Sequence, residues 1–227
     1  MAKLKRGLIA SCQAVKGEPL YGYNIMHLMA NACVEGGACG IRCNYVEDIK
    51  SIKNTVHVPI IGIIKAVYED SEVYITPTLK EVKELIEVGP DVIALDCTNR
   101  VRPNNEKLED LVKYIRDNSN IEIMADTDDY AGAKIAYELG FDYIGTTMRG
   151  YTKNTKGISI PDYDYLSNLV SMYPNTKIIA EGGIWELSQL EKVCECNPYS
   201  IVIGSAITRP KDITKRFVER INLKWKH

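Results

Sequence analysis

The sequence predicts a single (β/α)8 barrel, a TIM barrel, that spans residues 1–227. Short apolar runs alternate with amphipathic stretches along the whole chain, and they make up eight strand-then-helix units. No long linker or shift in composition divides them. A doubly wound open sheet is the alternative. It usually has fewer strands, and no Gly-x-Gly-x-x-Gly motif follows the first predicted strand.

Each predicted strand is a short apolar run bounded by turn residues or by an amphipathic stretch. The predicted strands are Gly7–Gln13, Cys39–Asn44, Ile60–Lys65, Val92–Asp96, Glu122–Ala125, Tyr143–Thr146, Lys177–Ala180 and Ser200–Gly204. The predicted helices between them are Tyr23–Glu35, Val46–Thr55, Thr78–Val88, Glu106–Asn118, Tyr130–Leu139, Tyr163–Tyr173, Glu186–Cys194 and Ile207–Ile221. Thr78 and Glu81 have the spacing of a capping box at a helix start.

The composition limits the partners and the compartment. The 28 basic against 30 acidic residues leave a formal charge of −2, so neither nucleic acid nor an anionic membrane is expected as a partner. The apolar run Gly7–Ala10 is too short for a signal peptide, and no stretch approaches the roughly 20 apolar residues of a membrane span. The seven cysteines contain no Cys-x-x-Cys pair, which is typical of reduced thiols and predicts a cytoplasmic location.

No metal site or other cofactor is predicted. The three histidines, His27, His57 and His227, show no ligand spacing. Magnesium binding by the carboxylates of Asp96 and Asp126 stays open as an alternative, although nothing in the sequence demands it.

Polar residues occupy the ends of successive predicted strands. In a barrel these ends converge above a filled interior, and catalytic side chains are found there. The residues at or just after these ends are Gln13, Arg42, Lys65, Asp96, Asp126 and Glu181, with Arg209 shortly after the eighth strand. We therefore expect one constellation at the barrel mouth.

Lys65 and Glu181 have the chemistry of a base and an acid. Inverting a carbon beside a carbonyl needs a base on one face and an acid on the other. A partly desolvated lysine has a lowered pKa and can act as the base, while a glutamate can hold or deliver the second proton. On spacing alone, an ion pair between Lys65 and Glu181 explains the same two residues equally well.

Two adjacent glycine-containing loops predict a phosphate site. Gly182-Gly183 follow the seventh strand and Gly204-Ser205 close the eighth, where many barrels bind phosphate through backbone N–H groups. The alternative is that these glycines serve only as tight turns.

Several segments between Gly7 and about Phe217 carry a family resemblance. They are Ser11–Ala14, Gly17–Leu20, Glu35–Ala38, Gly40–Arg42, Pro59–Lys65, Ser71–Thr78, Ile93–Asp96, Met124–Asp126, Gly145–Thr147, Gly150–Thr152, Ala180–Gly182 and Val202–Pro210. In these segments the chain resembles the bacterial N-acetylmannosamine-6-phosphate 2-epimerases.

The resemblance implies a barrel without metal or organic cofactor that converts N-acetylmannosamine 6-phosphate into N-acetylglucosamine 6-phosphate in sialic acid breakdown. It implies that Lys65 is the base and Glu181 the acid. The implied substrate-binding residues are Gln13, Arg42, Asp126 and Arg209.

The chain departs from the family pattern at two places. It has Gly183 where relatives often have a basic residue, and Met148-Arg149 where they have Leu-Ser. The resemblance also suggests a homodimer. Exposed apolar residues expected at Met172, Trp185 and Trp225 are compatible with a dimer, and equally with helix packing.

Two other functions remain open at the level of the sequence. A strand-end lysine in a barrel can form a Schiff base, as in a class I aldolase or lyase. A barrel can also bind a sugar phosphate as a sensor without turning it over.

Overall fold

A computed structural model describes residues 3–225, which form a closed barrel of eight parallel strands in chain order. The strands are β1 (Leu8–Cys12), β2 (Gly40–Asn44), β3 (Ile60–Ile63), β4 (Val92–Asp96), β5 (Glu122–Asp126), β6 (Tyr143–Gly145), β7 (Lys177–Glu181) and β8 (Ser200–Ile203). The barrel closes where Leu8, Ile9 and Ala10 of β1 pair with Ile201, Val202 and Ile203 of β8. The predicted fold class is confirmed. Residues 1–2 and 226–227, and with them His227 and the outer limits of the predicted domain, lie outside the described residues.

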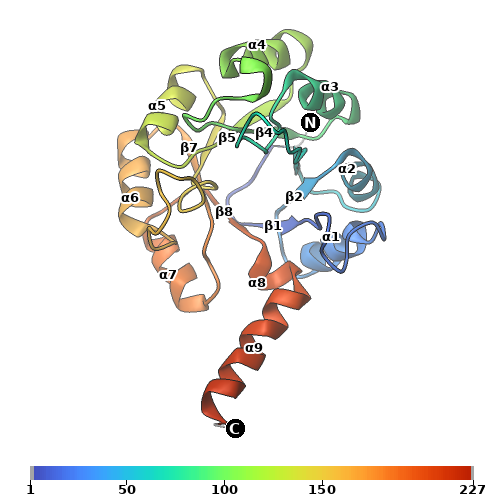
Figure 1. Cartoon of the computed structure of the whole chain (residues 1–227), viewed down its shortest axis with the longest axis vertical. Coiled ribbons are helices and arrows are strands. Elements are labelled where there is room, and N and C mark those ends of the chain that lie inside the picture. Colours follow the sequence, from blue (N-terminus) through green and yellow to red (C-terminus); the bar gives the residue numbers. More distant parts are fainter. Residues whose placement is uncertain (1–2, 226–227) are drawn as a thin grey trace.

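Helices surround the strands, as Figure 1 shows. They are α1 (Met26–Glu35), α2 (Val46–Lys53), α3 (Leu79–Val88), the 3-10 turn η1 (Pro103–Asn105), α4 (Leu108–Asn118), α5 (Tyr130–Glu138), α6 (Tyr163–Met172), α7 (Leu187–Glu195), α8 (Ser205–Thr208) and α9 (Pro210–Lys224). The capping box at the start of α3 is present. The Thr78 N–H donates to Glu81 Oε2 at 3.0 Å, and the Lys80 N–H donates to Thr78 Oγ1 at 3.3 Å.

Alternating strand residues divide the core into two apolar clusters. Ile9, Ile61, Met124, Tyr143 and Ile179 belong to the cluster inside the barrel, and their side chains are fully buried. The apolar residues that alternate with them, such as Ala10, Ile93 and Ile144, pack outward against the helices. Because side chains fill the interior, the barrel is not a pore, and space for a ligand is left only at its ends.

Strand ends differ from prediction at the positions that matter for the site. β3 ends at Ile63, so Lys65 lies two residues beyond it, in an isolated bridge with Ile75. The Lys65 N–H donates to the Asn44 side chain instead of to a neighbouring strand. Asp126 and Glu181 are the last residues of β5 and β7, and they do not follow those strands.

The helix predicted over Ile207–Ile221 is wrong in its limits and its continuity. Two helices, α8 and α9, meet at Arg209, whose backbone is non-helical (φ −120°, ψ 86°). The cause is Pro210, since a proline disfavours the helical conformation of the residue before it and is well placed in the first turn of a new helix. The predicted starts at Tyr23 and Glu106 are likewise too early, because α1 begins at Met26 and α4 at Leu108.

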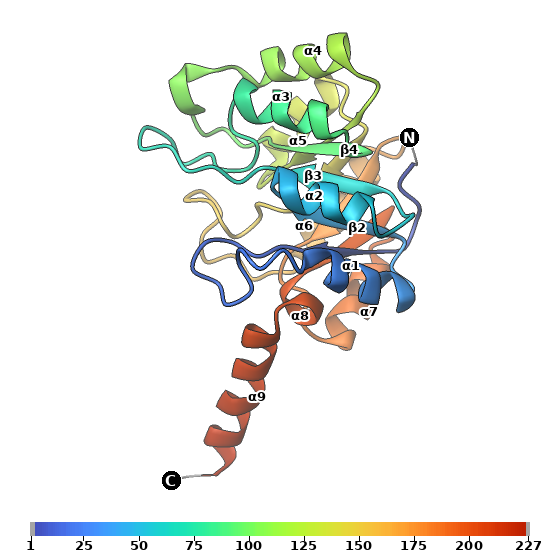
Figure 2. The same cartoon turned by 90° about the vertical axis from the view of Figure 1, so that its right-hand side faces the viewer.

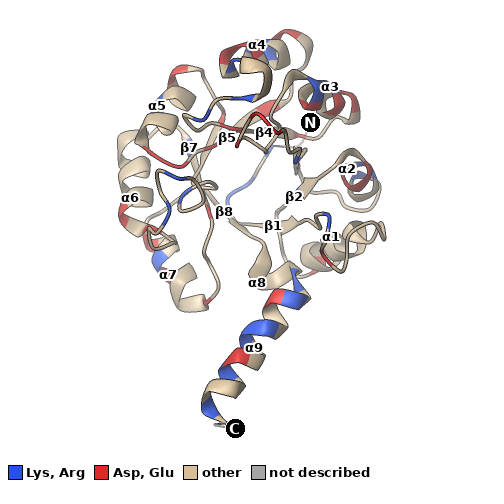
Figure 3. Ribbon diagram, in the orientation of Figure 1, with Lys and Arg blue, Asp and Glu red and all other residues tan. Residues whose placement is uncertain are grey.

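Helix α9 points away from the barrel (Figures 1 and 2). None of its residues is buried, and its basic and acidic side chains are interspersed along its length, as Figure 3 shows. In residues 3–225 no helix is both long and apolar enough to cross a membrane.

Candidate active site

A cavity of about 260 Å³ lies at the carboxyl ends of the strands. Figure 2 shows the loops after β1, β3 and β6 extending from this same end of the barrel. The cavity lining is Ser11, Gln13, Arg42, Ile63, Lys65, Tyr74, Ile75, Thr147, Met148, Tyr151, Glu181–Trp185, Val202–Ala206 and Arg209. A site at the carboxyl end of a parallel barrel is what the fold predicts.

Most of the predicted site residues come together in this cavity. The lining includes the predicted residues Gln13, Arg42, Lys65, Glu181, Gly182, Gly183, Gly204, Ser205 and Arg209. Asp126 lies beneath it, in contact with Arg42 and Thr147, and is not part of the lining. Asp96 also lies outside the lining, because Arg100 and Thr98 bind its side chain.

Lys65 is held by its backbone between two elements. Its N–H donates to Asn44 Oδ1 at 2.8 Å, and the next residue, Ala66, donates its N–H to the Tyr74 carbonyl at 3.0 Å. Burial, together with the nearby cations of Arg42 and Arg209, lowers the pKa of the Lys65 amine to about 8. A substantial share of this amine is therefore neutral near physiological pH.

Glu181 is fixed at the end of β7. Its N–H donates to Thr146 Oγ1 at 3.0 Å, and that hydroxyl donates to the Glu181 carbonyl at 2.9 Å. The side chain is 15% exposed and lies 3.3 Å from Arg42 Nη1. Burial raises the pKa of the Glu181 carboxyl above its usual range, although Arg42 opposes the shift. This carboxyl is therefore protonated more readily than an exposed glutamate.

The alternative explanation, an ion pair between Lys65 and Glu181, is not supported by the structure. Among residues 3–225, Lys65 makes no ion pair, and the cation close to Glu181 is Arg42. Both side chains therefore reach the cavity without neutralising each other. β3 and β7 lie on opposite sides of the eight-stranded ring, so the two groups approach the cavity from opposite walls.

A buried ion pair forms the floor beneath Glu181. Arg42 Nη1 and Nη2 donate to Asp126 Oδ1 and Oδ2 at 3.1 and 2.6 Å, and the two side chains are 1% and 0% exposed. Burial alone would lower the pKa of Arg42, but the carboxylates of Asp126 and Glu181 raise it, so the guanidinium stays charged. The two hydrogen bonds fix the plane of the Arg42 guanidinium relative to the plane of the Asp126 carboxylate.

The magnesium alternative finds no support in this geometry. Asp96 and Asp126 lie side by side in the β4–β5 register, but each is already bound to its own arginine. The described part of the chain contains no group of three His, Cys, Asp or Glu side chains arranged to hold a metal ion.

The two glycine loops form turns, and they also contain backbone N–H groups that are free to donate to a ligand. Gly183 has a φ of +73°, and a Cβ there would lie 2.6 Å from the carbonyl carbon and oxygen of Ile160. This close approach explains why no basic side chain stands at this position. Among the described residues, the backbone N–H groups of Gly183, Gly204 and Ser205 have no hydrogen-bond partner, and all three residues line the cavity.

Arg209 brings a cation to the same side of the cavity. Its Nη1 lies 2.9 Å from Glu18 Oε1, and the side chain remains 29% exposed. Gln13, on the neighbouring wall, donates to Ser11 Oγ at 2.9 Å, while its carbonyl oxygen is buried and has no partner among the described residues. An unpaired buried acceptor beside a cavity is suited to a ligand's hydroxyl or amide N–H.

Residues that sequence reasoning did not assign also line the cavity. They are Ser11, Tyr74, Thr147, Tyr151 and Trp185. Trp185, expected as an exposed apolar residue, lies partly buried beneath the Arg216 guanidinium, 4.6 Å from the ring centre, so that expectation is wrong. Met172 and Trp225 are exposed as predicted. Of the unassigned residues, only Thr147 could have been expected at the site from the sequence, because it directly follows a predicted strand.

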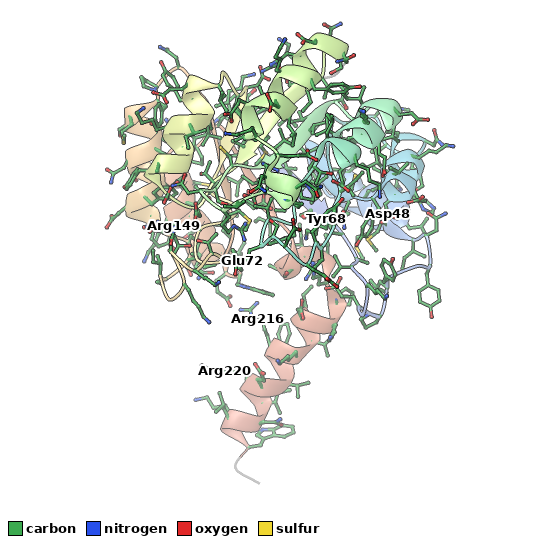
Figure 4. The ribbon with its side chains drawn as sticks, turned by 45° about the horizontal axis from the view of Figure 1, so that its top comes forward. Asp48, Tyr68, Glu72, Arg149, Arg216 and Arg220 are labelled. Atoms are coloured by element: carbon green, nitrogen blue, oxygen red, sulfur yellow. The ribbon has the colours of Figure 1, made fainter. Side chains whose placement is uncertain are left out.

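The Met148-Arg149 departure stabilises a loop. Met148 lines the cavity, whereas Arg149 donates to Asp162 at 2.8 and 3.0 Å and lies 4.4 Å from the ring centre of Tyr165. Figure 4 labels Arg149 on the loop between β6 and α6. The contacts of the Arg149 side chain thus stabilise the position of the loop that contains Tyr151.

Comparison with known proteins gives consistent results. The profile of the NanE family, described as "Putative N-acetylmannosamine-6-phosphate epimerase", matches residues 26–223. A Clostridioides difficile protein named "Putative N-acetylmannosamine-6-phosphate 2-epimerase" is 50% identical over 97% of this chain and 98% of its own length. A Listeria welshimeri protein of the same name is 49% identical over 96% and 94%.

Solved structures agree with the sequence comparison. The N-acetylmannosamine-6-phosphate 2-epimerase from Clostridium perfringens superposes with a TM-score of 0.91 at 45% identity, over 96% of this chain and 94% of that one. A thiamine phosphate pyrophosphorylase from Pyrococcus furiosus, 18% identical with a TM-score of 0.62, shares the fold alone. The chain belongs to the N-acetylmannosamine-6-phosphate epimerase family.

Proposed function

We propose that this protein interconverts N-acetylmannosamine 6-phosphate and N-acetylglucosamine 6-phosphate by moving a proton at carbon 2. The names of the relatives support this substrate. One observation carries the chemistry: Lys65 and Glu181 reach one cavity from opposite walls and do not pair with each other. The proposal places the reaction in sialic acid breakdown, in the cytoplasm, with a sugar phosphate as the only ligand and no cofactor.

Lys65 and Glu181 act in turn on the two faces of carbon 2. In the open-chain aldehyde, the neutral amine of Lys65 takes the carbon-2 proton, and the electron pair of the broken C–H bond forms the enolate. The protonated carboxyl of Glu181 then delivers a proton to the opposite face, which inverts the configuration. In the reverse direction the two groups exchange roles.

The two shifted pKa values suit this exchange. Burial lowers the pKa of Lys65 to about 8 and raises that of Glu181, so the two values move toward each other. At pH values between the two pKa values, Lys65 and Glu181 together hold one proton. That single proton is what a base and an acid acting together require.

The remaining residues hold the substrate. The free N–H groups of Gly183, Gly204 and Ser205, with Gly182 and the Arg209 cation, bind the phosphate. Gln13 offers its unpaired carbonyl oxygen to a polar group of the sugar. Arg42 lines the cavity, where it can bind the substrate, and it also lies 3.3 Å from Glu181. Asp126 lies beneath the cavity and supports Arg42, so it acts on the substrate indirectly.

Turnover of N-acetylmannosamine 6-phosphate followed by proton NMR tests the proposal. Signals of N-acetylglucosamine 6-phosphate should appear until both epimers are at equilibrium. Binding without turnover would instead indicate a sensor. Borohydride added during turnover should leave Lys65 unmodified, because only a Schiff-base aldolase forms a reducible lysine adduct.

We further propose that the protein is a homodimer in which a second copy covers α9. Most barrels place a full helix outside the last strand, but here only the four-residue α8 packs there. Phe217, Ile221 and Trp225 form an exposed stripe on α9, with Phe217 68% exposed. Leu28 on α1 and Leu187 on α7 are exposed apolar residues on the helices that flank this gap (Figure 1).

Light scattering of the double variant Phe217→Asp/Ile221→Asp tests the dimer. The wild type should have twice the mass of the chain and the variant the mass of one copy, because two buried carboxylates would oppose association. Lys215→Asp/Glu219→Lys, which changes two exposed charges of the same helix, is the matched control and should remain dimeric. A monomeric wild type contradicts the proposal.

A further inference from the structure

Thr147 lies between the two carboxyl groups of the site. Its Oγ1 is 2.6 Å from Asp126 Oδ1 and 3.2 Å from Glu181 Oε2. It lies two residues beyond the end of β6 and lines the cavity. No other described hydroxyl group bridges these two acids.

A threonine hydroxyl has one proton, so it cannot donate to both acids at once. The shorter contact assigns that proton to Asp126, whose Oδ1 and Oδ2 also accept from Arg42. Asp126 thus accepts three hydrogen bonds, two from Arg42 and one from Thr147. The side of Thr147 that faces Glu181 then presents only oxygen lone pairs.

Arg42 does not fill the same role for Glu181. Its Nη1 lies 3.3 Å from Glu181 Oε2, yet among the described residues its guanidinium hydrogen bonds are directed to Asp126 and to the Met124 sulfur. Glu181 Oε2 therefore meets a lone pair of Thr147 at 3.2 Å. This contact becomes a hydrogen bond when Glu181 is protonated and donates.

We propose that Thr147 favours protonation of Glu181: its hydroxyl donates to Asp126 and accepts from the protonated carboxyl of Glu181. This inference rests on the proposed epimerase function, because it makes Glu181 the acid of the pair. Burial raises the pKa of Glu181, whereas a hydrogen bond donated by Thr147 would lower it; donation to Asp126 at 2.6 Å removes that opposing effect. Thr147 touches no reacting atom in this account and acts as a positioning residue.

The pH profile of kcat/KM in Thr147→Val and Thr147→Ser tests the assignment. The acid limb of the profile marks the titration of Glu181. Valine keeps the shape but removes the acceptor, so protonated Glu181 loses its hydrogen bond and the limb should move to lower pH by about half to one unit. Serine restores the hydroxyl and should restore the limb. A limb that moves to higher pH, or that does not move, overturns the proposal.

Infrared difference spectra provide a readout that needs no turnover. The carboxylic acid C=O band of Glu181 should be present at pH values below the acid limb, disappear in Glu181→Gln, and shift to higher frequency in Thr147→Val. Absence of the band in the wild type overturns the inference. If the band behaves as expected but N-acetylmannosamine 6-phosphate is not converted, the proposed function fails and the proton assignment stands.

Discussion

Replacing Asp126 by asparagine should destabilise the fold far more than a typical charge change. Arg42 and Asp126 are 1% and 0% exposed and share two hydrogen bonds. The variant leaves a buried guanidinium without its carboxylate, and the new amide can offer only one acceptor to the two Nη donors. Removing one partner of a buried ion pair typically costs about 3–5 kcal/mol. Arg42 retains Glu181 at 3.3 Å, which places the expected loss toward the lower end, about 3 kcal/mol.

Urea unfolding followed by circular dichroism measures this loss. Asp117→Asn is the matched control, because Lys113 Nζ lies 2.6 Å from Asp117 Oδ2 while both side chains are mostly exposed. Its loss should be far smaller, because a solvent-exposed ion pair contributes little to stability. If Asp126→Asn and Asp117→Asn lose the same amount, the buried pair does not hold the floor of the site.

Three further results are expected at the site itself. Lys65→Ala should keep its fold, checked by circular dichroism, and lose about 10²–10⁴-fold in kcat, the usual contribution of a general base; unchanged turnover would remove Lys65 from that role. The wild-type pH profile should be bell-shaped. Above about pH 8 Lys65 loses its proton and neither group is an acid, whereas below the raised pKa of Glu181 both groups are protonated and neither is a base. A rate that keeps rising past pH 9 would contradict this. Gly204→Val, whose Cβ would lie 3.3 Å from Ser11 Cβ, should raise KM for the phosphorylated sugar. Unphosphorylated N-acetylmannosamine should be a very poor substrate of the wild type. Equal kcat/KM for both sugars would exclude the phosphate site.

Much of the site follows from the strand pattern. Apolar runs mark the strands, and because parallel strands of a barrel present their carboxyl ends together, Gln13, Arg42 and Glu181 could be assigned to one mouth from the sequence. The depth at which each side chain lies could not be predicted from the sequence. Asp126 and Glu181 both end strands, yet one lies in the floor and the other in the cavity wall, a difference set by side-chain packing around Arg42.

Loops account for most of what was missed. Tyr151 and Trp185 enter the cavity from segments without periodicity, and their positions depend on tertiary contacts such as Arg149 with Asp162 and Arg216 with Trp185. Figure 4 shows Arg216 nearer the barrel than Arg220 on α9. The break at Arg209, in contrast, was accessible from the sequence, because Pro210 disfavours a helical residue before it.

The central claim is that two groups on opposite walls move the carbon-2 proton, and Glu181→Gln tests it most directly. Glutamine keeps the shape and hydrogen bonding of the side chain but cannot exchange a proton. Proton NMR in deuterium oxide follows both the carbon-2 signal of N-acetylmannosamine 6-phosphate and the appearance of the other epimer. Lys65 should still remove the proton, so deuterium should enter carbon 2 without formation of N-acetylglucosamine 6-phosphate. Epimerisation by Glu181→Gln at the wild-type rate would contradict the account.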